Sequence, residues 1–381
     1  MQDFLPADME VFQSGRWAVV AVGAALIVGL PAAVAALPTS RSRVSAAALL
    51  TAIQHSAGVA YSGYAEASGG LALPVTSQFN SLADLFGGQT QLRVWWRGAT
   101  QWRVDTITET GESDLHQDGD RLWTWNYQSQ RTGLQLQRSA PAARLPVAAD
   151  LAPPSLARRL LSGAGAAQVS RLPVRRVAGC AVPGLRLRPS DPRSTIDSVD
   201  IWADPRTGVA LRVDELAAGQ SVISSQFLDF SSTPPSPDVI SFVPPGGVGQ
   251  AQLEGPDLIE FIDQLGNDRP PARLAGMDRI AQPDTDGAVG AYGRGVSEFT
   301  AIPLFGRIAD LLRAHLRTTF AVTTTVRGQA LSIGPLSLVL TPDLPFASDP
   351  GGDIGTAWLL TGTVTPATLG SAAAQLVGGN R

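Results

Sequence analysis

Residues 91–137 read QLRVWWRGATQWRVDTITETGESDLHQDGDRLWTWNYQSQRTGLQLQ and hold five of the eight tryptophans of the chain. Apolar and polar residues alternate there in five short runs, which is the pattern of antiparallel strands. Trp123, Trp125 and Tyr127 stand two residues apart, so one strand would put all three rings on the same side of a sheet. Residues 118–120, Asp-Gly-Asp, suit a tight hairpin turn. The stretch therefore predicts a meander with an aromatic face, which a helix, the rest of a barrel or an apolar ligand must cover.

Composition narrows the class of protein. A chain of 381 residues is long enough for two domains with tails. The formal net charge of -4, the pI near 5.4 and the absence of a long basic run argue against nucleic-acid binding. The single cysteine, Cys180, excludes an internal disulfide framework and a multi-cysteine metal site. His55, His116 and His315 lie far apart and lack metal-ligand spacing, so we expect no metal and no cofactor.

Catalytic patterns are equally scarce. The sequence has no GxSxG motif and no Ser, His and Asp arrangement that would single out a triad. Glu109, Glu112 and Asp114 cluster between two predicted strands, and paired carboxylates can perform acid–base chemistry, yet this spacing is also common at the solvated end of a hairpin. We therefore expect a protein that is not an enzyme and has no catalytic residues. A secreted hydrolase stays as a remote alternative.

An apolar run lies near the N-terminus. Residues 17–37, WAVVAVGAALIVGLPAAVAAL, carry no charge and would span roughly 31 Å as a helix. The run is longer than the core of a cleavable signal peptide, and the segment before it is acidic. We predict a cytoplasmic tail over residues 1–16 and an uncleaved single-pass transmembrane anchor over residues 17–37. Cleavage near Ala33 and Ala35 is the alternative, and the flanking arginines weakly oppose an outward-facing chain.

The remainder of the chain divides into two predicted units. In the first, a helix within residues 44–57 leads into a strand over 59–68, and a short helix at 155–161 separates the meander from further strands over 167–230. About ten or eleven antiparallel strands result, enough to curl into an open barrel. In the second unit the periodicity predicts helices at 256–265, 305–316 and 366–377, with strands at 320–326, 329–333, 336–340 and 356–364.

The aromatic face supports two interpretations. Its rings can be ordinary core, packed against the helices. Alternatively, they can line an apolar cavity between a curled sheet and the helices, because such a cavity needs shape and apolar surface but few polar groups. Burying an acyl chain of about sixteen carbons would contribute on the order of 12 kcal/mol before ordering and association costs. We predict that the cavity is lined by Leu92, Val94, Trp96, Trp102, Val104, Trp123, Trp125, Tyr127, Val209, Leu211 and Val213.

Three motifs resemble a known group of families. Residues 113–126, SDLHQDGDRLWTWN, resemble a strand pair of the LolA/LolB lipoprotein carriers and of the RseB (MucB)-type sigma-E regulators. Residues 197–230, with IWADPRTGVALRVDEL and SQFLDF, resemble the RseB-type strand, turn and strand more than LolA. Residues 241–247, SFVPPGG, resemble the FxPPxG ending of both families. The resemblance covers about residues 44–247.

The resemblance implies an α+β, LolA-like fold. Residues 44–250 would form an antiparallel half-barrel of about 10–11 strands with helices plugging its concave side. Residues 254–381 would form a smaller α+β C-terminal domain, which RseB-type proteins have and LolA carriers lack. An apolar cavity for lipid or an acylated lipoprotein, no enzymatic activity and an extracytoplasmic position are implied as well. An uncleaved anchor would be a departure, because both families are typically released into the periplasm.

Together these observations predict a membrane-anchored, extracytoplasmic lipid- or lipoprotein-binding protein that acts as a sensor or regulator of envelope stress. The expected partners are a lipid or acylated lipoprotein, and an anti-sigma factor or other membrane protein, with no nucleic acid. A tethered lipoprotein or lipid carrier without a regulatory partner is the alternative.

Overall fold

A computed structural model describes residues 42–69, 88–108, 111–136, 146–246, 249–250, 269–281, 287–319, 322–325, 328–344 and 356–379. The predicted tail, the predicted anchor and the predicted helix at 256–265 lie outside these residues. Among the helices that the structure describes, none is long and apolar enough to cross a membrane.

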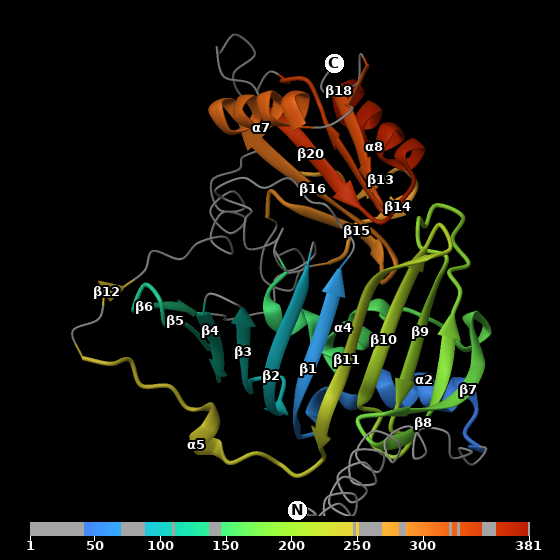
Figure 1. Cartoon of the computed structure of the whole chain (residues 1–381). Helices are drawn as coiled ribbons and strands as arrows, with labels where there is room; N and C mark the ends of the chain where they lie inside the picture. Colours follow the sequence, from blue (N-terminus) through green and yellow to red (C-terminus); the bar gives the residue numbers. More distant parts are fainter. Residues whose placement is uncertain are drawn as a thin grey trace, which may run out of the picture. The chain divides into compact units, whose positions relative to one another are not determined.

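Twelve strands form the large sheet (Figure 1). The first meander contains β1 (Tyr61–Gly69), β2 (Gln89–Gly98), β3 (Gln101–Thr108), β4 (Gly111–Asp118), β5 (Arg121–Asn126) and β6 (Arg131–Leu136). The second contains β7 (Val169–Val177), β8 (Cys180–Leu187), β9 (Ser198–Ala203), β10 (Ala210–Ala217) and β11 (Gln220–Ser231). Strand β11 returns to pair with β1, so the two meanders form one antiparallel sheet. The two-residue β12 (Gly249–Gln250) adds to β6 in parallel.

Two hairpins of the second meander turn through pairs of residues with positive φ. Ala178 and Gly179 join β7 to β8 with φ of 46° and 76°. Ala218 and Gly219 join β10 to β11 with φ of 49° and 74°. Positive φ at both central residues matches the twist of the flanking strands, which is why these short connections keep the strands paired.

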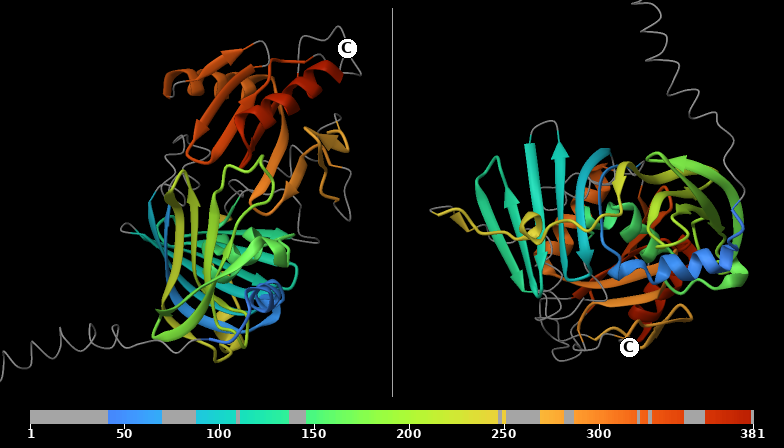
Figure 2. Two further views of the ribbon diagram at one scale, coloured as in Figure 1. Left: turned by 90° about the vertical axis from the view of Figure 1, so that its right-hand side faces the viewer. Right: turned by 90° about the horizontal axis from the view of Figure 1, so that it is seen from below.

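Two short helices and a 3-10 turn cover one face of the large sheet, which we call the inner face. Helix α2 (Ala46–Gln54) begins at Ser45, whose hydroxyl accepts a hydrogen bond from the Ala48 amide at 3.1 Å. Helix α4 (Pro153–Leu160) follows the 3-10 turn η2 (Ala148–Leu151) and has prolines in its first turn. Figure 2 shows the β7–β11 half of the sheet curving around these helices. Buried side chains of α2 and α4 pack with those of β8, β9, β10 and β11.

The second sheet has six antiparallel strands. Their order is β15 (Gly290–Arg294), β16 (Ser297–Phe305), β20 (Thr356–Gly362), β19 (Leu336–Leu340), β18 (Gly328–Ile333) and β17 (Thr323–Thr325). Helices α7 (Gly306–Thr319) and α8 (Pro366–Gly379) complete this part, beside the short hairpin of β13 (Arg273–Leu274) and β14 (Met277–Asp278). In its core, the ring of Tyr292 stacks on that of Phe299 with centroids 5.0 Å apart.

The architecture is mostly β. The predicted number of strands in the large sheet is right, because the eleven antiparallel strands carry a clear two-residue alternation. The α+β description gave the helices too much weight. Helices α2 and α4 have only nine and eight residues, so they cover part of a sheet and do not form a layer of their own.

Candidate ligand-binding face

Strand register separates the tryptophans of the meander into two groups, because residues directly opposite each other in an antiparallel pair share a face. Trp102 stands opposite Trp96, and both belong to the inner face. Trp123 stands opposite His116, and Trp125 opposite Asp114. His116 in turn stands opposite Arg103, whose partner on β2 is Trp95 rather than Trp96. Trp123 and Trp125 therefore lie on the other side of the sheet, which we call the outer face.

The eleven residues predicted to line one cavity are thus not brought together. Eight are buried on or at the inner side: Leu92, Val94, Trp96, Trp102, Val104, Val209, Leu211 and Val213. Trp123 and Trp125 lie on the outer face, and Tyr127 lies in the turn after β5 with half of its surface exposed. A single cavity lined by all eleven is incompatible with this register. Whether the eight inner residues contact a ligand stays a prediction.

The alternation could not reveal this division because β4 carries polar residues on both faces. Asp114 and His116 are buried on the outer face, and Gln117 is buried on the inner one. A strand with polar residues on both sides does not indicate which side is core. The sequence alone therefore does not show which side chains of β5 lie on the same face of the sheet as the apolar side chains of β3.

A column of aromatic rings dominates the inner face of β1, β2 and β3. The rings of Tyr61 and Trp96 stack with centroids 6.0 Å apart, and those of Trp96 and Trp102 with centroids 5.9 Å apart. The indole N–H of Trp96 donates to the carbonyl oxygen of Ala57 at 2.8 Å, and that of Trp102 to the carbonyl oxygen of Ala99 at 3.2 Å. These bonds fix the rings, so the inner face presents a rigid apolar surface.

Among the described residues, few directed bonds hold the cover to this surface. The indole of Trp96 donates to Ala57, just after α2, whereas the side-chain amide of Gln54 on α2 donates within the cover, to the carbonyl oxygens of Leu161 and Ala164 at 2.9 and 3.2 Å. The hydroxyl of Ser225 on β11 donates to the carbonyl oxygen of Leu151 at 2.5 Å. Most of the remaining contact is apolar packing. Apolar packing has no directional requirement, so an acyl chain could replace part of it.

One cation faces the aromatic column from α4. The guanidinium of Arg158 lies 5.2 Å from the ring centre of Trp96. It donates long hydrogen bonds to the hydroxyls of Ser56, at 3.5 Å, and Ser155, at 3.3 Å, and it lies beside the phenol of Tyr61. Burial lowers the pKa of Arg158, and the neighbouring Tyr61 opposes that shift. No ion pair of Arg158 with a carboxylate is recorded among the described residues.

The outer face of β2, β3 and β4 carries a network of charged side chains. Arg103 bonds both carboxylate oxygens of Asp105, at 2.6 and 2.9 Å, and reaches Asp114 at 3.0 Å. Arg93 reaches Glu112 at 2.5 Å. Burial raises the pKa of Asp105 above its usual range, although Arg103 works in the opposite direction. Asp105, Glu112 and Asp114 could together offer ligand atoms to a cation, but each is already engaged by a guanidinium.

His116 lies beside this network without a catalytic arrangement. Its Nδ1 lies 2.8 Å from the carbonyl oxygen of Ile240 and must donate to it, because a carbonyl only accepts. Its Nε2 lies 3.8 Å from the nearer oxygen of Asp114, beyond a hydrogen bond. Hydrolysis would need a nucleophile against this imidazole, and the recorded contacts of His116 supply none. Glu109 lies outside the described residues.

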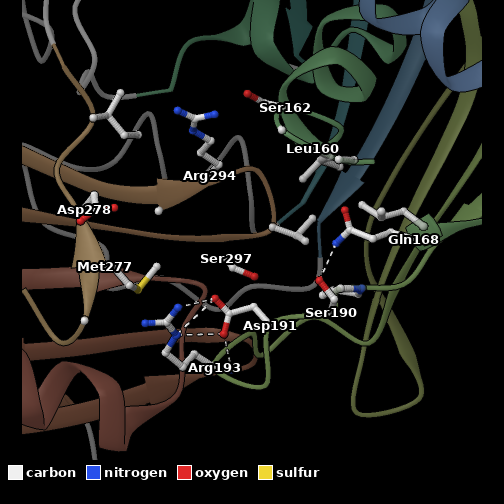
Figure 3. Close-up of a pocket in the computed structure, with 18 of the residues that line it drawn as sticks. Leu160, Ser162, Gln168, Ser190, Asp191, Arg193, Met277, Asp278, Arg294 and Ser297 are labelled. Carbon is white, nitrogen blue, oxygen red and sulfur yellow. Dashed lines mark hydrogen bonds and ion pairs between the residues drawn. The ribbon is translucent and has the colours of Figure 1, made fainter. Parts of the chain in front are cut away.

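A pocket of about 480 Å³ lies between the α4 end of the large sheet and the second sheet (Figure 3). Leu160, Gln168 and Asp191 line one side, and Met277 and Arg294 line the other. Several of its polar groups pair within the wall: Arg193 with Asp191 at 2.8 Å, and Gln168 with Ser190 at 2.9 Å. This polar lining differs from the apolar cavity that the sequence predicts.

No protein-family model matches the sequence, and no curated protein matches it. Among solved structures, the chain is similar to MucB in complex with MucA(peri), with 15% identity and a TM-score of 0.45 over 86% of this chain and 97% of that one. The Pseudomonas aeruginosa MucA/MucB complex gives 16% identity and a TM-score of 0.47 over 86% and 96%. A LolA superfamily protein from Nitrosomonas europaea gives 10% identity and a TM-score of 0.21 over 52% and 98%. The similar structures thus include MucB and a LolA superfamily protein, the two groups that the sequence motifs resemble.

Sequence reasoning missed Tyr61 and Arg158. Tyr61 opens a strand that the alternation predicted, but its position in the ring column depends on pairing with Trp96, 35 positions further along the chain. Arg158 sits four residues after Pro154 and three before Leu161, both buried. Residues three and four apart are neighbours on a helix. An arginine between two apolar residues on one helix face was the available signal.

Proposed function

We propose that this chain is a binding protein without enzymatic activity, and that its inner face takes the acyl chain of a lipid or of an acylated lipoprotein. The observation that carries the proposal is the ring column of Tyr61, Trp96 and Trp102 beneath a cover that few directed bonds among the described residues attach to the sheet. In this proposal the large sheet acts as a half-barrel, and α2, η2 and α4 are the plug that an acyl chain displaces.

The cellular role belongs to the same proposal. The chain would be held in the membrane by residues 17–37, with its bulk extracytoplasmic, and would regulate envelope-stress signalling through an anti-sigma factor. This part rests on the sequence motifs at 113–126, 197–230 and 241–247 and on the apolar run itself. It is tested separately, by asking whether the full chain in detergent retains the anti-sigma factor encoded nearest to it. Failure to retain it would favour a tethered carrier without a regulatory partner.

Ligand binding can be localised by tryptophan quenching, because bromine on an acyl chain quenches only the rings that it approaches. The full chain is titrated with 9,10-dibromostearate, and the loss of tryptophan fluorescence is recorded. Two double variants are compared: Trp96→Phe with Trp102→Phe on the inner face, and Trp123→Phe with Trp125→Phe on the outer face. We expect the quenched fraction to fall by about half or more in the inner variant and to be retained in the outer one.

The outer variant is the matched control, since it removes the same number of indoles from the same sheet. Circular dichroism verifies that both variants are folded. If quenching were lost in the outer variant and kept in the inner one, the ligand would bind on the outer face, which would contradict the proposal. The absence of any quenching, together with no lipid in the mass spectrum of the purified protein, would end the proposal.

A further inference from the structure

The hydroxyl of Tyr61 is a buried donor without an acceptor. The residue is fully buried, and its Oη has no hydrogen-bond partner in the structure. Burial raises the pKa of Tyr61, although Arg158 works against the shift, so the hydroxyl keeps its proton. A guanidinium has only N–H donors, so it cannot accept that proton. An unpartnered buried hydroxyl typically destabilises a fold, and its presence here calls for an acceptor.

Arg158 is a partly exposed cation beside this hydroxyl. A guanidinium carries five N–H donors, and those of Arg158 meet two serine hydroxyls at 3.3 and 3.5 Å, both long for a hydrogen bond. The hydroxyl of Ser56 also donates its own proton elsewhere, to the carbonyl oxygen of Ile53 at 2.7 Å. The charge is offset mainly by the face of Trp96. Among the described residues no carboxylate pairs with Arg158, so its positive charge has no anionic counterpart there.

An anionic oxygen would give the Tyr61 hydroxyl an acceptor and Arg158 a counter-charge. A carboxylate or phosphate can accept from the guanidinium and from the phenol together, and such charge-assisted bonds are strong where water is excluded. The apolar remainder of the same molecule would lie along Trp96 and Trp102. The chemistry is that of an anionic amphiphile.

We propose that Arg158 and Tyr61 form an anion subsite on the inner face, which selects ligands whose acyl chain ends in a carboxylate or phosphate. The inference rests on the proposed function and specifies the head group that the same face would recognise. It also makes α4 part of the ligand site, because Arg158 is on that helix and would move with it as the plug opens.

The test compares ligands that differ only in charge. Palmitate, hexadecyl phosphate and methyl palmitate are titrated by displacement of cis-parinaric acid from the full chain. We expect palmitate and hexadecyl phosphate to bind about tenfold or more tightly than methyl palmitate. Inorganic phosphate and acetate at the same concentrations serve as free-anion arms, and we expect neither to displace the probe.

The variants are Arg158→Gln, Arg158→Lys and Tyr61→Phe, with Arg159→Gln as the control. Arg159 is the next residue and a similar cation, but its partner is Glu298, 3.9 Å away. The preference for palmitate over methyl palmitate should vanish in Arg158→Gln, survive in Arg158→Lys and Arg159→Gln, and weaken in Tyr61→Phe. If Arg158→Gln does not fold, Tyr61→Phe, which removes one hydroxyl only, decides the matter.

The outcomes separate the two proposals. Equal affinity for palmitate and methyl palmitate in the wild type would refute the anion subsite and leave acyl binding intact. Full retention of the preference in Tyr61→Phe and Arg158→Gln would place the head group elsewhere. No displacement by any of the three amphiphiles would refute the proposed function itself. Displacement by acetate or phosphate alone would indicate an anion site unconnected to lipid.

Discussion

A single carboxyl group shows how the inner face responds to charge. Glu215 on β10 stands opposite Val199 on β9, beneath the helices. Its side chain is only 4% exposed. Burial raises its pKa to about 7, while the positive charge of Arg159 works in the opposite direction. The folded protein therefore holds this proton more tightly than the unfolded chain, whose glutamates titrate near 4.5. Stability that depends on the protonated form is fully present below pH 4.5 and is lost as the pH rises to 7.

Replacing Glu215 by glutamine should make the protein more resistant to urea above pH 7. Glutamine stays neutral, so the variant avoids the cost of burying a charge, and we expect a gain of roughly 1 to 3 kcal/mol in the free energy of unfolding at pH 8. At pH 4 the two proteins should differ little. The same substitution at Glu66, on the outer face of β1, is the control. An equal gain at both pH values would contradict the burial argument.

At the scale of elements, a strap over the outer face decides which aromatic rings are covered. The strap comprises residues 236–243 and contains the short helix α5 (Pro237–Ile240). The ring of Phe242 lies 4.8 Å from that of His116, 5.8 Å from that of Trp123 and 6.2 Å from that of Trp125. The predicted aromatic face of β5 is therefore covered by the chain itself. This answers one of the alternatives that the sequence left open: these two rings meet a segment of their own chain.

Truncating the strap ring should expose the rings beneath it. We expect Phe242→Ala to shift tryptophan emission to longer wavelength and to lower the free energy of unfolding by about 1 to 3 kcal/mol, less than for a fully buried phenylalanine. Val243→Ala is the neighbouring control, since Val243 is 84% exposed. Emission spectra and urea denaturation give both quantities. An unchanged emission maximum in Phe242→Ala would show that the strap does not shield these rings in solution.

At the scale of the whole molecule, the hairpin of β15 and β16 joins the second sheet to the end of α4. Gly295 has a φ of 60°, and a β-carbon there would lie 2.7 Å from the carbonyl oxygen of Ser162 and 2.9 Å from that of Leu160. The Arg159 guanidinium lies 3.9 Å from Glu298 on β16. The hydroxyl of Ser194, in the β8–β9 loop, donates to the carbonyl oxygen of Val296 at 2.8 Å. The proposed plug helix is thus in direct contact with the second sheet.

An alanine at Gly295 should loosen this contact. The substitution combines an unfavourable φ with a clash, so we expect about 2 kcal/mol or more to be lost from the free energy of unfolding. Gly119 offers a matched control, because its φ is 62° and a β-carbon there would have no other atom within 4 Å. Gly119→Ala should lose about 1 kcal/mol from φ alone. Urea denaturation measures the loss in the free energy of unfolding for each variant. Equal losses in the two variants would show that the hairpin is not tightly packed on α4.

Part of this protein could be predicted from its residues alone. Two-residue alternation identifies strands because it reports the local environment of successive side chains, and β1 to β11 lie in or beside the stretches where strands were predicted. The short helix after the meander follows equally from local signals. The division of the chain into half-barrel and C-terminal domains, and the anchor, stay predictions of the sequence.

Only the tertiary structure decided which face each ring occupies. Trp96 and Trp123 each stand in a short run of alternating apolar and polar residues, yet they lie on opposite sides of one sheet. The pairing of β2 with β3, β3 with β4 and β4 with β5 decides on which side each ring lies. Arg158 meets Tyr61 and Trp96 only because the sheet and α4 bring together residues that lie 97 and 62 positions apart in the chain. Alternation is a property of neighbours in the chain. The phase between strands and the partner of a buried charge depend on contacts between distant residues, and folding alone creates those contacts.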